Sequence, residues 1–138
     1  MTHGISTRAS SILATLVVAL PFMGPAQSEP IRQTLLQKVV PGMPTSKNQE
    51  VRVITATFKP GDKTILHTHQ FPVTYYVLEG SFKKELEGYP PVIVKAGQSF
   101  MEPPNAKATL FNHSSTEPLR LVIFYVSNED TPFLDPVH

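Results

Sequence analysis

The sequence predicts an all-β domain, built as a sandwich or a barrel. Short runs of apolar and β-branched residues are separated by turn signals at close intervals, a spacing typical of this class. No stretch of about 10 to 15 residues shows sustained helical periodicity. The chain also contains 14 prolines, roughly twice the usual share of about 5%. Proline favours turns, strand starts and sheet edges over long helices.

The predicted strands lie where apolar runs meet turn residues. Residues 31–40 lead into the Pro41-Gly42 turn, so we expect an early strand there. Residues 51–58 are rich in β-branched side chains and predict a strand that ends at the turn 59–62. The other runs expected to form strands are residues 64–69, 73–79, 82–86, 92–95, 100–102, 108–111 and 119–126.

Turn residues bound each of these runs. The breaks fall at Gly80, 87–91, Gly97, 103–105 and the polar loop 112–118. Run 119–126 is the most apolar and predicts a central strand. The tail, residues 127–138, is polar and proline-rich, and we expect its Phe133 and Leu134 to pack back against the barrel.

Length and charge indicate an ordinary single-domain protein. The 138 residues suggest one domain, and the 12 basic and 11 acidic residues predict no nucleic-acid partner. The chain has no cysteine, so any bound metal must use imidazole, carboxylate or water as ligands.

Residues 1–28 have the pattern of a cleavable signal peptide. Arg8 supplies positive charge, residues 12–23 are mostly apolar, and Ala26-Gln27-Ser28 is a small-x-small cleavage site. A membrane span takes about 20 apolar residues, so the run is too short for one. A buried core helix is the alternative. We expect cleavage after Ser28, or otherwise after Ala26, leaving residues 29–138 as a periplasmic or secreted domain without a membrane contact.

His67 and His69 are the clearest chemical signal in the chain. On a strand, residues two apart point to the same face, so the two imidazoles can converge on one point. Imidazole is a suitable ligand for zinc, copper, iron and nickel. Two unrelated surface or core histidines are the alternative interpretation of the pair alone.

The residues around this pair resemble the first motif of the cupin superfamily, which reads G-x5-H-x-H and ends at a later glycine. Gly61, His67, His69 and Gly80 are all in register with it. The stretch from Gly97 through Pro103 to Asn112 is similar to the second motif, G-x5-P-x-G-x2-H-x3-N. The resemblance extends from about residue 51 to about residue 126. It implies a single antiparallel jelly-roll barrel that holds a metal ion.

Two positions depart from the ligand set that the resemblance implies. The motif glutamate is replaced by Val73 and the second-motif histidine by Ala108. Neither side chain can coordinate a metal, so two of the family's four ligands remain. Asn105 replaces the motif glycine, and asparagine also accepts left-handed backbone angles.

Glu102 is the best candidate to complete the site. It ends an otherwise apolar run just before Pro103, and carboxylates are rarely buried unless paired or bound to metal. Two histidines and one carboxylate are typical of non-haem iron(II) oxygenases. The alternatives are a solvent-facing Glu102 or an ion pair with a lysine. His113 is a poorer ligand candidate, because strand alternation separates it from Asn112.

Several other residues are candidates for a pocket or a surface. The possible pocket residues are Tyr75, Val77, Phe100, Ala108 and Asn112, with plain core packing as the alternative. We expect Lys83 and Lys84 to form a solvated edge. Lys107 lies near the barrel corner, where it could meet an anionic substrate.

Two functions remain open at this point. In the first, the protein is an exported metal-dependent enzyme in which a divalent ion (Fe, Mn, Ni or Zn) acts on a small organic molecule. Oxygenase, isomerase and lyase chemistry all fit this fold, and the fold does not choose among them. In the second, it is a non-catalytic cupin that binds a small ligand with weak or no metal. The resemblance also implies a homodimer.

Overall fold

The computed structural model describes Met1, Gly4 and residues 29–138. The rest of the predicted signal peptide therefore lies outside the described residues. Residues 33–138 form one compact unit. Within the described part of the chain there is no helix, and so none long and apolar enough to cross a membrane.

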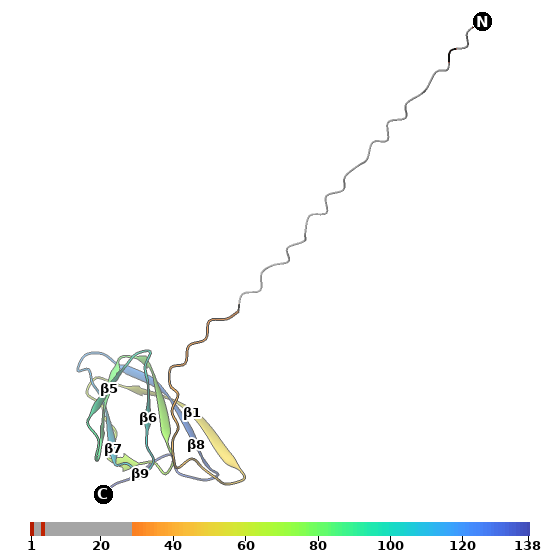
Figure 1. Ribbon diagram of the computed structural model, residues 1–138. Coiled ribbons are helices and arrows are strands. Elements are labelled where there is room, and N and C mark those ends of the chain that lie inside the picture. Colours follow the sequence, from red (N-terminus) through yellow and green to blue (C-terminus); the bar gives the residue numbers. More distant parts are fainter. Residues whose placement is uncertain (2–3, 5–28) are drawn as a thin grey trace. The chain divides into compact units, whose positions relative to one another are not determined.

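The strands form two antiparallel sheets (Figure 1). The first sheet has the order β1 (Gln49–Phe58), β8 (Leu119–Asn128), β3 (Val73–Glu79) and β6 (Ser99–Glu102). The second has the order β5 (Val92–Lys95), β4 (Ser81–Leu86), β7 (Ala108–Asn112), β2 (His67–Thr68) and β9 (Asp135–Pro136). The predicted all-β class is confirmed, and β8 is the central strand that its apolar sequence predicts, because it pairs with β1 and β3.

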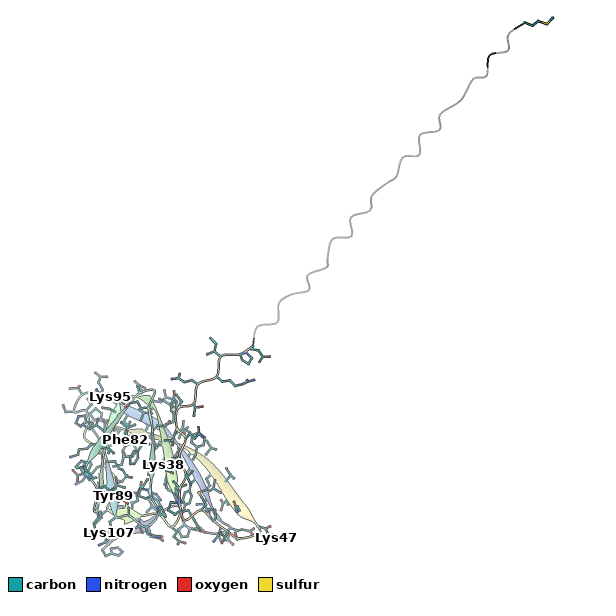
Figure 2. All side chains as sticks on the ribbon, in the orientation of Figure 1. Lys38, Lys47, Phe82, Tyr89, Lys95 and Lys107 are labelled. Atoms are coloured by element: carbon teal, nitrogen blue, oxygen red, sulfur yellow. The ribbon has the colours of Figure 1, made fainter. Side chains whose placement is uncertain are left out.

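The core lies between the two sheets. Alternate residues of β8 are buried, which is the period-two pattern of a strand with one face in the core. Tyr75 from the first sheet meets Phe82 from the second, with ring centroids 5.8 Å apart. Figure 2 shows Phe82 inside the domain and Lys47, Lys95 and Lys107 at its periphery. Side chains thus occupy most of the interior, and a site within it is shielded from water.

The structure corrects two strand predictions. Residues 31–40 form no strand, and Val39 is 98% exposed. Their apolar side chains do not recur with period two, so no single face of the segment could enter the core. Of residues 64–69 only His67–Thr68 is a strand, because Ile65 and Leu66 are exposed and lack strand neighbours.

The C-terminal tail packs back against the domain, as predicted. Phe133 lies with its ring centroid 4.7 Å from that of His69 and 5.3 Å from that of Tyr125. Strand β9 then pairs with β2 in the second sheet. The last residues of the chain therefore enclose the histidine pair.

Candidate metal centre

His67, His69 and Glu102 come together inside the domain. His67 begins β2 and His69 directly follows its last residue, whereas Glu102 ends β6 of the other sheet. All three side chains are buried, and their potential ligand atoms lie within 4.8 Å of one another. The predicted convergence of the two imidazoles and the carboxylate is confirmed.

The spacing of these atoms suits a shared ion after small adjustments. His69 Nε2 lies 4.0 Å from Glu102 Oε2. Two ligands bound at about 2.0 to 2.2 Å can be separated by at most about 4.0 to 4.4 Å. The widest separation in the group slightly exceeds that limit, so a side chain would have to move by a few tenths of an ångström.

Both imidazoles are oriented through Nδ1. His67 Nδ1 donates to the carbonyl of Ile65 at 2.7 Å, and His69 Nδ1 donates to the carbonyl of Phe133. These bonds assign the proton to Nδ1 and leave the Nε2 lone pair as the available ligand. Burial also lowers the pKa of both histidines, which favours the neutral form that a metal requires.

Two atoms of the group have no hydrogen-bond partner among the described residues. These are His69 Nε2 and Glu102 Oε1, both fully buried. A buried polar atom without a partner costs free energy, so it needs an explanation. A metal ion bound at these two atoms would provide one, and the donor set fits a divalent ion.

Glu102 restores the carboxylate that the motif lacks. In the pairing of β3 with β6, Val73 lies directly opposite Glu102. Directly opposed residues of neighbouring antiparallel strands project from the same face of the sheet. Glu102 on β6 can therefore reach the interior region that a glutamate at position 73 on β3 would reach. By contrast Ala108, opposite His67 in β7, leaves the fourth ligand position without a donor.

Lys84 is the residue beside the site that the sequence interpretation misplaced. We expected a solvated lysine, but its side chain is 0% exposed. Lys84 is in phase with Phe82 and Leu86, the inward-facing residues of β4, whereas Lys83 points outward and pairs with Glu85 at 2.7 Å. The alternation of apolar residues around Lys84 indicated the face on which it lies, but not the anion that makes its burial stable.

Lys84 and Tyr75 both hold the same oxygen of Glu102. Lys84 Nζ lies 2.6 Å and Tyr75 Oη 2.7 Å from Glu102 Oε2. Lys84 Nζ also donates to Tyr75 Oη at 3.2 Å. Desolvation lowers the pKa of Lys84, an effect that the Glu102 charge opposes, and it raises the pKa of Tyr75 well above its usual value. The interior thus holds a close Lys84–Glu102 pair, a phenol that donates to the same carboxylate oxygen, and two imidazoles whose neutral form burial favours.

The two imidazoles, Tyr75 and Lys84 border a small cavity of about 180 Å³, and Glu102 lies behind them. Its polar lining comes from His67, His69, Tyr75, Lys84 and Thr64, and its apolar walls include Ile54, Leu121, Ile123 and Phe133. Such a volume is below the roughly 300 to 1,000 Å³ of most ligand pockets, so only a small molecule would fit.

Tyr75 is the one candidate pocket residue that borders this cavity. Val77 lies in the hydrophobic core, and Phe100 borders a separate hollow beside Tyr89. Ala108 is buried in β7, opposite His67 of β2. Asn112 instead donates its amide to three backbone carbonyls and fixes the loop that precedes β8.

The remaining polar candidates lie elsewhere on the domain. His113 is exposed and does not belong to the buried group of potential ligands. Lys107 is an exposed residue whose Nζ lies 3.5 Å from a Glu87 carboxylate oxygen. Neither side chain is close enough to the cavity to line it.

Comparison with known proteins identifies a family and a shared fold. The cupin domain family matches residues 54–125, more than half of the chain. A cupin-like protein from Thermotoga maritima MSB8 is 24% identical with a TM-score of 0.54, over 63% of this chain and 64% of that one. The DMSP lyase DddQ from Ruegeria pomeroyi DSS-3 is 16% identical with a TM-score of 0.55, over 63% of this chain and 43% of that one.

A third structure covers more of both chains. It is a Klebsiella pneumoniae protein with a double-stranded β-helix domain, 18% identical with a TM-score of 0.55, over 73% of this chain and 90% of that one. This chain spans less than two thirds of the first two structures. At these identities the likeness is to the fold alone, and no curated protein sequence matches the chain. From the extent of the family match and the agreement in fold, the chain belongs to the cupin family.

Proposed function

We propose that this cupin binds one divalent metal ion through His67, His69 and Glu102 and acts on a small organic molecule in the adjoining cavity. The observation that carries the proposal is the buried convergence of two Nδ1-anchored imidazoles and one carboxylate. When bound, the ion would supply Lewis-acid chemistry. Iron, manganese, nickel and zinc are all compatible with this donor set.

The residues around the site would orient the reacting molecule. The apolar wall would exclude water and hold the organic part of the molecule against the ligands. Tyr75 Oη and Lys84 Nζ lie beside Glu102 and would contact a polar group of that molecule. Oxygenase, isomerase and lyase reactions each remain compatible with such a site.

Metal content is the direct test. Protein purified without a histidine tag should contain near-stoichiometric metal by elemental analysis, and a His67→Ala, His69→Ala double variant should contain almost none. His113→Ala is the matched control, because this histidine is exposed and outside the group. A wild-type protein with no more metal than the double variant would contradict the proposal.

One observation favours a second candidate, a non-catalytic protein that binds a small ligand. The Lys84 ammonium already neutralises Glu102, so the interior is charge-balanced without an ion. For this candidate, a small ligand should bind metal-free protein and the double histidine variant with equal affinity. Loss of ligand binding together with the metal would exclude it.

We also propose that the mature protein is exported, acts in the periplasm or outside the cell, and is a homodimer. The charged, apolar and small-x-small pattern of residues 1–28 supports export. N-terminal sequencing of protein produced from the full-length chain tests it, with Glu29 or Gln27 as the expected first residue. Sedimentation equilibrium tests the dimer, and a monomer mass at micromolar concentration would refute it.

A further inference from the structure

Lys84 is a buried cation at the edge of the cavity. Among the cavity-lining residues that the structure describes, it is the one lysine or arginine. Its side chain has no exposed surface, and its Nζ contacts Glu102 Oε2 and Tyr75 Oη. A fully buried ammonium is stable only when an anion or several polar acceptors lie next to it.

Metal binding would change the charge of this interior. The ammonium of Lys84 and the carboxylate of Glu102 cancel each other when no ion is bound. A divalent ion held by Glu102 and two neutral imidazoles would bring the net charge of the same groups to +2. An ion at Glu102 Oε1 would share the carboxylate with Lys84, which contacts Oε2, and would weaken the attraction that holds the ammonium there. In a low-dielectric cavity such an excess of positive charge strongly favours an anion.

We propose that the metal-loaded cavity selects a small carboxylate, and that Lys84 exchanges Glu102 for the carboxylate group of this ligand. The inference rests on the proposed metal binding and adds the chemical class of the ligand. The apolar wall of Ile54, Leu121 and Ile123 fits a short hydrocarbon body, and the volume of about 180 Å³ excludes a large one. The ligand class is therefore a short-chain organic acid.

Butyrate and butyramide are suitable probes, because they share size and shape but differ in charge. Isothermal titration calorimetry of the tag-free protein, zinc-loaded and metal-free, measures the affinity of each probe. Zinc is chosen because it has no redox chemistry. Zinc-loaded wild type should bind butyrate at least about tenfold more tightly than butyramide, since charge-assisted hydrogen bonds are the stronger ones. Metal-free protein should show no such preference.

Lys84→Met tests the assignment to this residue. The variant should lose about tenfold in butyrate affinity, with butyramide affinity unchanged and zinc affinity no weaker, because a second cation at Glu102 is removed. Lys84→Gln is the second variant, since its amide can still donate to Glu102 if the methionine variant folds poorly. Lys83→Met is the matched control on the outward face of β4 and should bind as wild type.

Each outcome separates the inference from the function on which it rests. If zinc does not bind wild type, the proposed function and the inference both fail. If zinc binds but butyramide matches butyrate, or if both Lys84 variants keep the full preference for butyrate, only the inference fails. Equal butyrate affinity in metal-free and zinc-loaded protein would also overturn it.

Discussion

The buried ion pair predicts a large, specific loss of stability when its lysine is removed. At the observed 2.6 Å and an effective dielectric constant of about 20, the attraction between Lys84 and Glu102 is about 6 kcal/mol before desolvation is subtracted. Removing one partner of a buried pair typically costs about 3 to 5 kcal/mol, because the other charge stays buried. We therefore expect Lys84→Met to lower the free energy of unfolding of the metal-free protein by about 3 to 5 kcal/mol.

Urea unfolding of chelator-treated protein measures this change. Circular dichroism and tyrosine fluorescence can both report it, because the chain has four tyrosines and no tryptophan. Lys83→Met is the control, since its pair with Glu85 is exposed and should contribute at most about 1 kcal/mol. The double variant Lys84→Met, Glu102→Gln removes both charges and should recover part of the loss. A Lys84→Met loss no larger than that of the control would refute the reasoning.

Three further predictions follow from the site and the turns. Burial lowers the pKa of His67 and His69, so below the ordinary histidine pKa the unfolded chain binds more protons than the folded one. The stability of metal-free protein should therefore fall as pH drops from about 7 to 5, and a urea midpoint that does not change with pH would contradict this. Deleting residues 133–138 removes the Phe133 carbonyl that holds His69 Nδ1, and it should weaken zinc binding by about 10- to 100-fold in a competition titration. Unchanged zinc affinity would show that the tail does not orient His69. In urea unfolding, Gly80→Ala should destabilise the protein more than Gly97→Ala, although both glycines have positive φ. A Cβ at Gly80 would lie 2.4 Å from a backbone oxygen, whereas a Cβ at Gly97 would have no atom within 4 Å, so equal losses of stability would exclude the steric explanation.

The local sequence pattern was sufficient to predict most of the strands. Strands such as β3, β4 and β8 were predictable because alternation with period two and the flanking turn residues are properties of contiguous sequence. The segment 31–40 was wrongly predicted, since apolar content without alternation does not identify a strand. The two-residue strands β2 and β9 depend on pairing between distant parts of the chain, which a local pattern does not contain.

Some features of the candidate site were likewise predictable from the sequence, whereas others required the tertiary structure. The sequence by itself determined the histidine pair, since residues two apart on an extended segment share a face, and it indicated Glu102 as a carboxylate in an apolar run. Only the tertiary structure decided that Val73 lies opposite Glu102, that Lys84 neutralises this carboxylate, and that the tail carbonyl orients His69. A lysine can be buried or solvated with the same neighbours in sequence. Which state is stable depends on whether the opposite sheet places an anion within reach.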